Sequence, residues 1–129
     1  MESLEQYINK HHKNEEKRVD LVTYLYHLMD KYGMDAPTLY KKANITKQSY
    51  SSIISNKCIP SLNTLIKIVF ALKADTHECK YLLKKAGYTL ASSSTYALII
   101  RYCIENKIYD LATLNEYLMK YGYDDNIVE

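Results

Sequence analysis

The side chains whose types and spacing could bind a ligand gather between Asp35 and Asp75. No acidic residue lies between these two aspartates, whereas six lysines do: Lys41, Lys42, Lys47, Lys57, Lys67 and Lys73. At the centre of this region, segment 46–57 is a short polar stretch of lysine, glutamine and serine. Such side chains donate hydrogen bonds to phosphates and make donor or acceptor contacts with base edges. The sequence therefore predicts that this stretch contacts nucleic acid.

The distribution of charge indicates the same region. Residues 31–85 hold ten basic and three acidic side chains, whereas residues 1–30 hold four and six and residues 86–129 hold three and six. A concentrated positive charge attracts polyanions, so the middle of the chain is the predicted contact surface. A solvated basic surface without a partner is the alternative interpretation.

Two short helices are predicted to position this stretch. Asp35 is expected to cap a helix, because aspartate is a preferred N-cap residue, and this helix is expected to end at Lys42 or Ala43. Asn44 suits the left-handed backbone of a tight turn, and Thr46 caps the next helix, over 46–55. Two short helices joined by such a turn are typical of a helix-turn-helix.

The second of these helices is predicted to present a polar face. Tyr50 and Ile53 are three residues apart, and we expect both to face the core. The predicted base-contacting residues are those left facing outward: Lys47, Gln48, Ser49, Ser51 and Ser52. Glutamine suits an adenine edge, lysine suits guanine or a phosphate, and serine suits either.

The remaining elements are predicted to be helices as well. Apolar residues recur at helical spacing from about Lys17 to Tyr32, after Pro60-Ser61, and after the capping-box pair Asp75 and Glu78. Ser61 is expected to cap the helix that follows it. A further helix is expected from Ser94 or Thr95 to about Asn106, and another, capped by Asp110, up to Gly122. The chain is therefore assigned to the all-α class.

Residues 18–87 resemble a domain of the Cro/phage-repressor (XRE-type) helix-turn-helix family. Segment 46–53 is similar to that family's recognition helix, Asn56-Lys57 to the turn that follows it, and segment 60–72 to its next helix, with many positions in register. The resemblance implies a five-helix lambda-repressor-like DNA-binding domain plus two C-terminal helices, with double-stranded DNA as the partner. It places Lys47, Gln48 and Ser52 at bases, and Ser55 and Lys57 near phosphates. The predicted phosphate contacts are Lys41, Lys42, Ser55, Asn56 and Lys57.

The sequence predicts three parts: an N-terminal arm or short helix over 1–16, a helix-turn-helix domain over 17–88 and a helical extension over 89–129. Two interpretations of the extension remain open. Its helices could pack on the five-helix core and enlarge it, or part of them could form the interface of a homodimer or of a complex with another partner.

No pattern in the sequence indicates catalysis, so we expect no catalytic residue and no enzyme activity. No cofactor motif and no metal-ligand spacing is present, and His11-His12 lacks a cysteine or carboxylate partner at zinc spacing. Cys58, Cys79 and Cys103 are expected to be reduced thiols in a cytoplasmic protein. No membrane association is expected, because no apolar run approaches the length of a membrane span.

The favoured function is sequence-specific DNA binding by a transcriptional regulator, such as a repressor. The alternative is a protein-binding adaptor built on a helix-turn-helix scaffold, of phage or mobile-element origin. Ala36 and Tyr40 favour this alternative, because the family usually has a glutamine and a small residue at these positions. The excess of acidic residues over 86–129 favours it too.

Overall fold

The described part of the chain belongs to the all-α class, as predicted. The structure, a computed structural model, describes residues 3–90 and 94–123, and it places the side chains of these residues outside 9–20. The helices are α1 (Leu4–Lys31), α2 (Ala36–Lys42), α3 (Lys47–Ile54), α4 (Leu62–Leu72), α5 (Thr76–Lys85), α6 (Thr95–Glu105) and α7 (Leu111–Lys120). No strand occurs among the described residues.

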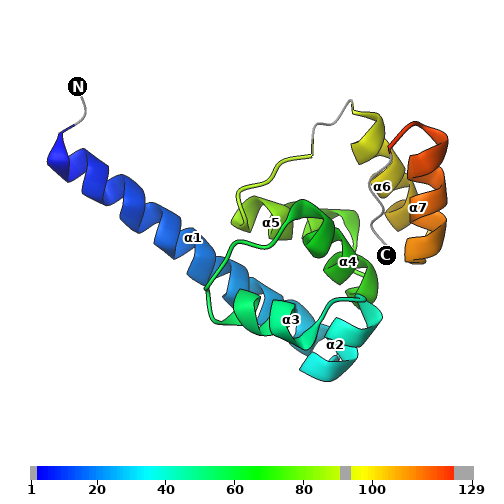
Figure 1. The fold of residues 1–129 in the computed structure, drawn as a ribbon, viewed down its shortest axis with the longest axis horizontal. Coiled ribbons are helices and arrows are strands. Elements are labelled where there is room, and N and C mark those ends of the chain that lie inside the picture. Colours follow the sequence, from blue (N-terminus) through cyan, green and yellow to red (C-terminus); the bar gives the residue numbers. More distant parts are fainter. Residues whose placement is uncertain (1–2, 91–93, 124–129) are drawn as a thin grey trace.

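Helix α4 lies at the centre of the fold (Figure 1). Its apolar residues are buried around most of its circumference, and Phe70 is among the largest fully buried side chains. Helix α2 packs on one side of α4 and α5 on another, while α1 runs along α5. The core is therefore built around α4, and α3 is attached to it through α2.

Side-chain caps begin the helices where the sequence predicted. The side-chain oxygens of Asp35, Thr46, Ser61 and Asp75 each accept a hydrogen bond from a backbone N–H in the first turn. Gly33 follows α1 with φ 61°, a left-handed backbone that glycine adopts without the steric cost of a Cβ. Local sequence thus determines where these elements start and stop.

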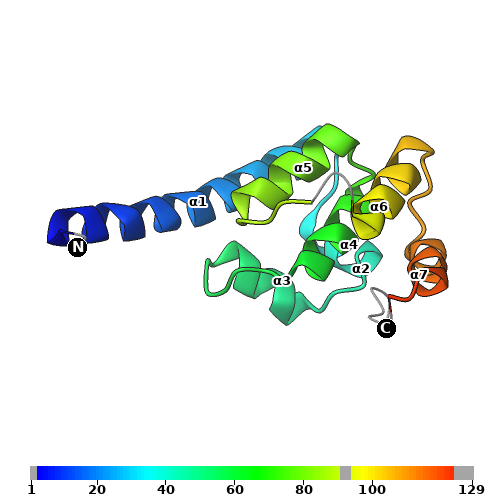
Figure 2. The same ribbon diagram turned by 90° about the horizontal axis from the view of Figure 1, so that it is seen from above.

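Helix α1 differs from the predicted pattern. The expectation was an arm or short helix over 1–16 and a separate helix from about Lys17, but one continuous helix of 28 residues runs from Leu4 to Lys31. Its C-terminal half packs on α5, whereas its N-terminal half projects from the body of the molecule (Figure 2). Because the projecting half has little core to face, its apolar residues Leu4, Tyr7 and Ile8 are exposed.

Helices α6 and α7 pack on the core formed by the preceding helices. Ile100, Cys103, Leu114 and Leu118 are fully or almost fully buried in the same apolar cluster as α4 and α5. The Tyr109 ring lies edge-on to Phe70, with 5.8 Å between the ring centroids, and its hydroxyl donates a 2.9 Å hydrogen bond to the Ala74 carbonyl. The extension therefore enlarges the core, which was the first of the two interpretations.

Within the described residues, no helix combines the length and the apolar character that crossing a membrane requires.

Candidate nucleic-acid interface

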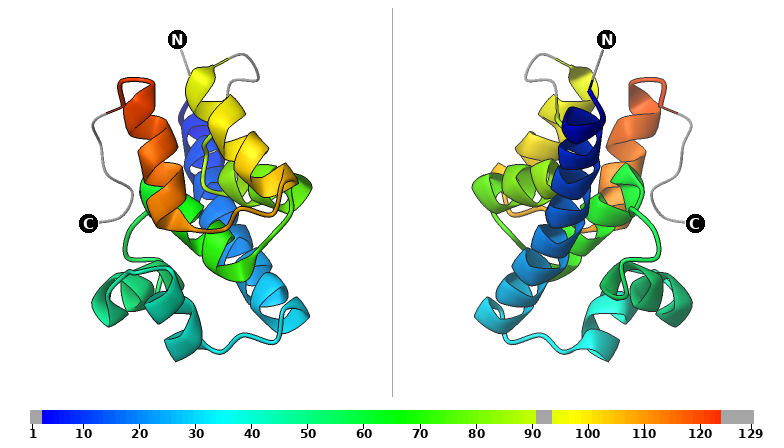
Figure 3. Two further views of the ribbon diagram at one scale, coloured as in Figure 1. Left: turned by 90° about the vertical axis from the view of Figure 1, so that its right-hand side faces the viewer. Right: turned by 90° about the vertical axis from the view of Figure 1, so that its left-hand side faces the viewer.

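Helix α3 lies at one edge of the molecule, away from α6 and α7 (Figure 3). Tyr50 and Ile53 anchor it, with only 9% and 3% of their surfaces exposed. Since these two residues face inward, the polar residues between and before them face outward. Of the predicted base-contacting residues, Lys47, Gln48, Ser49 and Ser51 are exposed and Ser52 is half-buried.

The turn between α2 and α3 is held by hydrogen bonds from backbone N–H groups. Asn44 has the predicted left-handed backbone, with φ 56°. The Ile45 N–H donates to the Tyr40 carbonyl at 3.0 Å, and the Ser49 N–H donates to the Thr46 hydroxyl oxygen at 3.0 Å. These bonds satisfy groups at both helix ends and fix how α3 leaves the turn.

An aromatic pair joins the two helices beyond the turn. The Tyr40 ring from α2 lies 5.9 Å from the Tyr50 ring of α3, measured between centroids. Burial raises the pKa of Tyr50 above its ordinary value, with a smaller contribution from Tyr26. A large residue at position 40 is therefore accommodated as a packing partner for α3.

The C-terminal end of α3 turns sharply at Asn56, which has a left-handed backbone with φ 59°. The Lys57 N–H donates to the Ser52 carbonyl at 3.1 Å, and the side chains of Asn56 and Lys57 are exposed. The Ser55 hydroxyl donates to the Ser51 carbonyl at 2.8 Å. Ser55 would have to give up this bond before its hydroxyl could donate to a phosphate.

The lysines near α3 are available to an anion. Lys41, Lys42, Lys47 and Lys57 are exposed, the first two at the C-terminal end of α2 and the last just beyond α3. No carboxylate among the described residues forms an ion pair with any of the four. Within the described part of the fold, none of the four is therefore held in a salt bridge.

A shallow pocket of about 310 Å³ lies between α3 and the start of α4. Gln48, Ser49 and Ser52 line it from α3, so the structure brings these three predicted residues together. Lys47 and Ser51 do not line it. The other lining residues that could meet a ligand were not predicted as site residues: Cys58, Ile59, Ser61 and Thr64.

Ser61 and Thr64 bring polar groups to the pocket from α4. The Ser61 hydroxyl oxygen accepts from the Thr64 N–H at 3.2 Å and lies 2.9 Å from the Thr64 hydroxyl. The N-terminus of a helix favours negative charge. The sequence marked Ser61 as an N-cap and both residues as part of the family-like segment 60–72, which indicates a helix and not a ligand site.

The three cysteines are free thiols; Cys58 is exposed, and Cys79 and Cys103 are buried. Among the residues whose side chains are placed, no group of three or more His, Cys, Asp or Glu could hold a metal ion. His11 and His12 lie in the segment whose side chains the structure does not place. Comparison of the chain with protein-family models, curated proteins and solved structures found no significant match.

Proposed function

We propose that the protein is a cytoplasmic, sequence-specific double-stranded DNA-binding protein, and that it regulates transcription. In this proposal α1 to α5 act as a lambda-repressor-like helix-turn-helix domain, and α3 enters the major groove. The observation that carries the proposal is the outward face of α3, where lysine, glutamine and serine side chains lie between exposed lysines that form no salt bridge with the described residues. A short helix with such a face has the form of a major-groove reader.

The basic residues at the two ends of α3 would supply most of the affinity. Lys41 and Lys42 approach α3 from the end of α2, and Asn56 and Lys57 follow it in the chain. Phosphate contacts at both ends would fix the position of the helix along the duplex, and each neutralised phosphate releases a counterion.

Selectivity would come from the first turns of α3. Gln48 and Lys47 can reach base edges as donors, and the Gln48 side chain can also accept. Ser49, Ser51 and Ser52 add shorter contacts. One lysine, one glutamine and three serines make a small reading surface, so a second copy bound at an adjacent half-site would be needed for tight binding.

The test is a comparison of three variants in a duplex-binding assay over a range of salt concentrations. Duplexes are first selected from a random pool with the wild-type protein. Gln48→Ala should relax the base preference at one position by about 1–3 kcal/mol, and Lys57→Ala should weaken binding to every duplex and reduce the salt slope by about one. Lys107→Ala, between α6 and α7, is the matched control and should change neither quantity. Failure of the wild-type protein to discriminate among duplexes at about 150 mM salt would contradict the proposal.

A protein-binding adaptor is the second candidate function. It is favoured by the exposed apolar side chains on α6 and α7, where Leu98, Tyr102, Met119 and Tyr121 are each about half exposed or more. Stable co-purification with another protein, together with no retention on DNA, would support the adaptor over the regulator.

A further inference from the structure

The projecting end of α1 carries an apolar stripe. Leu4 and Ile8 lie one turn apart and have 75% and 44% of their surfaces exposed, and Tyr7 beside them is 53% exposed. The helix end is well formed, because the side chains and backbones of Ser3 and Gln6 make a reciprocal capping box. The stripe is therefore presented on a capped helix end and not on a frayed terminus.

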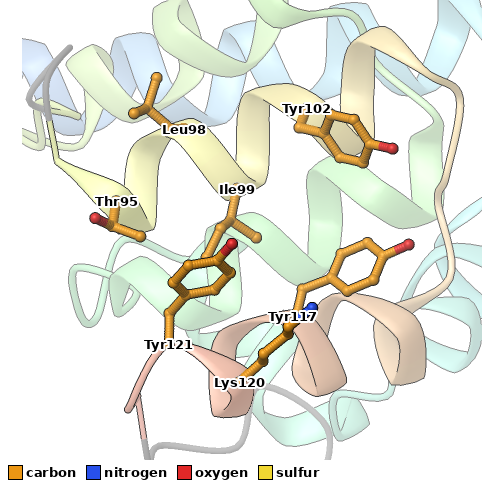
Figure 4. Close-up of a pocket in the computed structure, with 7 residues that line it drawn as sticks. All are labelled: Thr95, Leu98, Ile99, Tyr102, Tyr117, Lys120 and Tyr121. Carbon is orange, nitrogen blue, oxygen red and sulfur yellow. The ribbon is translucent and has the colours of Figure 1, made fainter.

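A second apolar surface lies at the opposite end of the molecule. A groove of about 520 Å³ runs between α6 and α7, and its lining includes Leu98, Ile99, Tyr102, Tyr117, Lys120 and Tyr121 (Figure 4). The Tyr102 and Tyr117 rings lie edge to face across the two helices, with 6.2 Å between their centroids. Aromatic side chains of this kind are common anchors in protein interfaces.

The two surfaces cannot meet within one molecule. Leu21, Leu25 and Leu28 are almost fully buried and fix the C-terminal half of α1 in the core. Because α1 is one continuous helix, its N-terminal end points away from α6 and α7 (Figure 1). A helix end in the groove must therefore come from another chain.

We propose that the occupant of the α6–α7 groove is the N-terminal end of α1 from a second copy of this chain. An amphipathic helix that lays its apolar side into an apolar groove is a common mode of recognition. The charges also agree: Glu5, beside Leu4 and Ile8 on the helix, is acidic, whereas Lys120 on the groove is basic.

Two-fold symmetry makes the contact reciprocal. Each copy inserts its α1 end into the groove of the other, so the pair closes as a dimer instead of growing into a chain. The dimer would supply the second copy of α3 that the proposed DNA-binding function calls for. The inference does not rest on that function, because oligomeric state is measured without DNA.

The first test measures self-association of the full-length protein by sedimentation and light scattering. The wild-type protein should dimerise reversibly. Leu4→Asp and Leu98→Asp each place a charge at one of the two surfaces and should weaken the dimer by at least tenfold. Met119→Asp, at an exposed apolar position on α7 outside the groove lining, is the matched control and should dimerise as the wild type does. Circular dichroism checks that each variant remains helical, and Lys120→Glu replaces Leu98→Asp if that variant unfolds.

Mixing the two variants distinguishes this arrangement from the alternatives. The Leu4→Asp chain keeps an intact groove and the Leu98→Asp chain keeps an intact helix end. An equimolar mixture should therefore form a heterodimer through one intact contact, although each variant alone is monomeric. A monomeric wild-type protein at about 100 μM, or unchanged dimerisation of Leu4→Asp, would overturn the proposal. Loss of dimer in Leu98→Asp without recovery in the mixture would also overturn it, in favour of a groove that pairs with itself.

Discussion

The ammonium group of Lys31 lies 2.7 Å from a carboxylate oxygen of Glu78 and forms an ion pair with it. The pair joins the last turn of α1 to the first turn of α5. Glu78 is 6% exposed and also accepts hydrogen bonds from the Tyr32 hydroxyl and the Asp75 N–H. A buried carboxylate with three donors fixes the two helices to each other at this point.

Replacing Glu78 by glutamine should make the stability of the protein less dependent on pH. Burial tends to raise the pKa of Glu78, but the hydrogen bonds from Lys31, Tyr32 and Asp75 outweigh burial and lower it. A lowered pKa means that the carboxylate stabilises the fold above about pH 4.5, its ordinary pKa, and that this contribution is lost as pH falls through the lowered value. Glu78→Gln should cost about 2 kcal/mol at pH 7 and progressively less in acid, measured by urea denaturation. A constant difference at every pH would contradict this role.

Two substitutions of Tyr50 should distinguish how much its ring and how much its hydroxyl contribute to the free energy of unfolding. The hydroxyl donates a long hydrogen bond to the Met29 sulfur, at 3.8 Å, and a thioether is a weak acceptor. Tyr50→Phe should therefore change the free energy of unfolding by less than about 0.5 kcal/mol, whereas Tyr50→Ala should cost about 3 kcal/mol. Chemical denaturation of both variants checks the prediction. A large loss in Tyr50→Phe would show that the hydroxyl matters more than the ring.

The three thiols should differ in reactivity. Cys58 is exposed, whereas burial raises the pKa of Cys79 to about 12 and also raises the pKa of Cys103. Because the thiolate is the reactive form, a disulfide reagent at neutral pH should modify Cys58 rapidly and the other two only on unfolding. Cys58→Ser should remove the rapid phase. Rapid reaction of that variant would contradict the burial of the other two.

A glycine at position 107 should stabilise the turn between α6 and α7. Lys107 has a left-handed backbone with φ 57°, which is unfavourable for a residue with a Cβ. Lys107→Gly should raise the free energy of unfolding by about 0.5–1 kcal/mol, after allowance for the greater flexibility of glycine in the unfolded chain. Lys107→Ala keeps the Cβ, so it should give no such gain in thermal or chemical denaturation. An equal gain in both variants would indicate that the lysine charge, and not its backbone, is unfavourable.

The predicted caps show which parts of the fold depend on local sequence. Asp35, Thr46, Ser61, Asp75 and Asp110 begin helices as expected, and Asn44 takes the left-handed backbone of the turn. A cap or a turn involves residues only a few positions apart, so composition and spacing are enough to place it. The inward direction of Tyr50 and Ile53 follows in the same way from helical periodicity.

The sequence by itself thus determined the all-helical class, most helix boundaries and the outward polar face of α3. Only the tertiary structure decided that α1 is continuous, that Tyr40 packs on Tyr50, and that Ser61 and Thr64 meet Gln48 in one pocket. It also decided which apolar residues of α6 and α7 enter the core and which line a groove. Apart from the continuity of α1, these features bring together side chains from different helices, and such pairs are set by how helices pack and not by local periodicity.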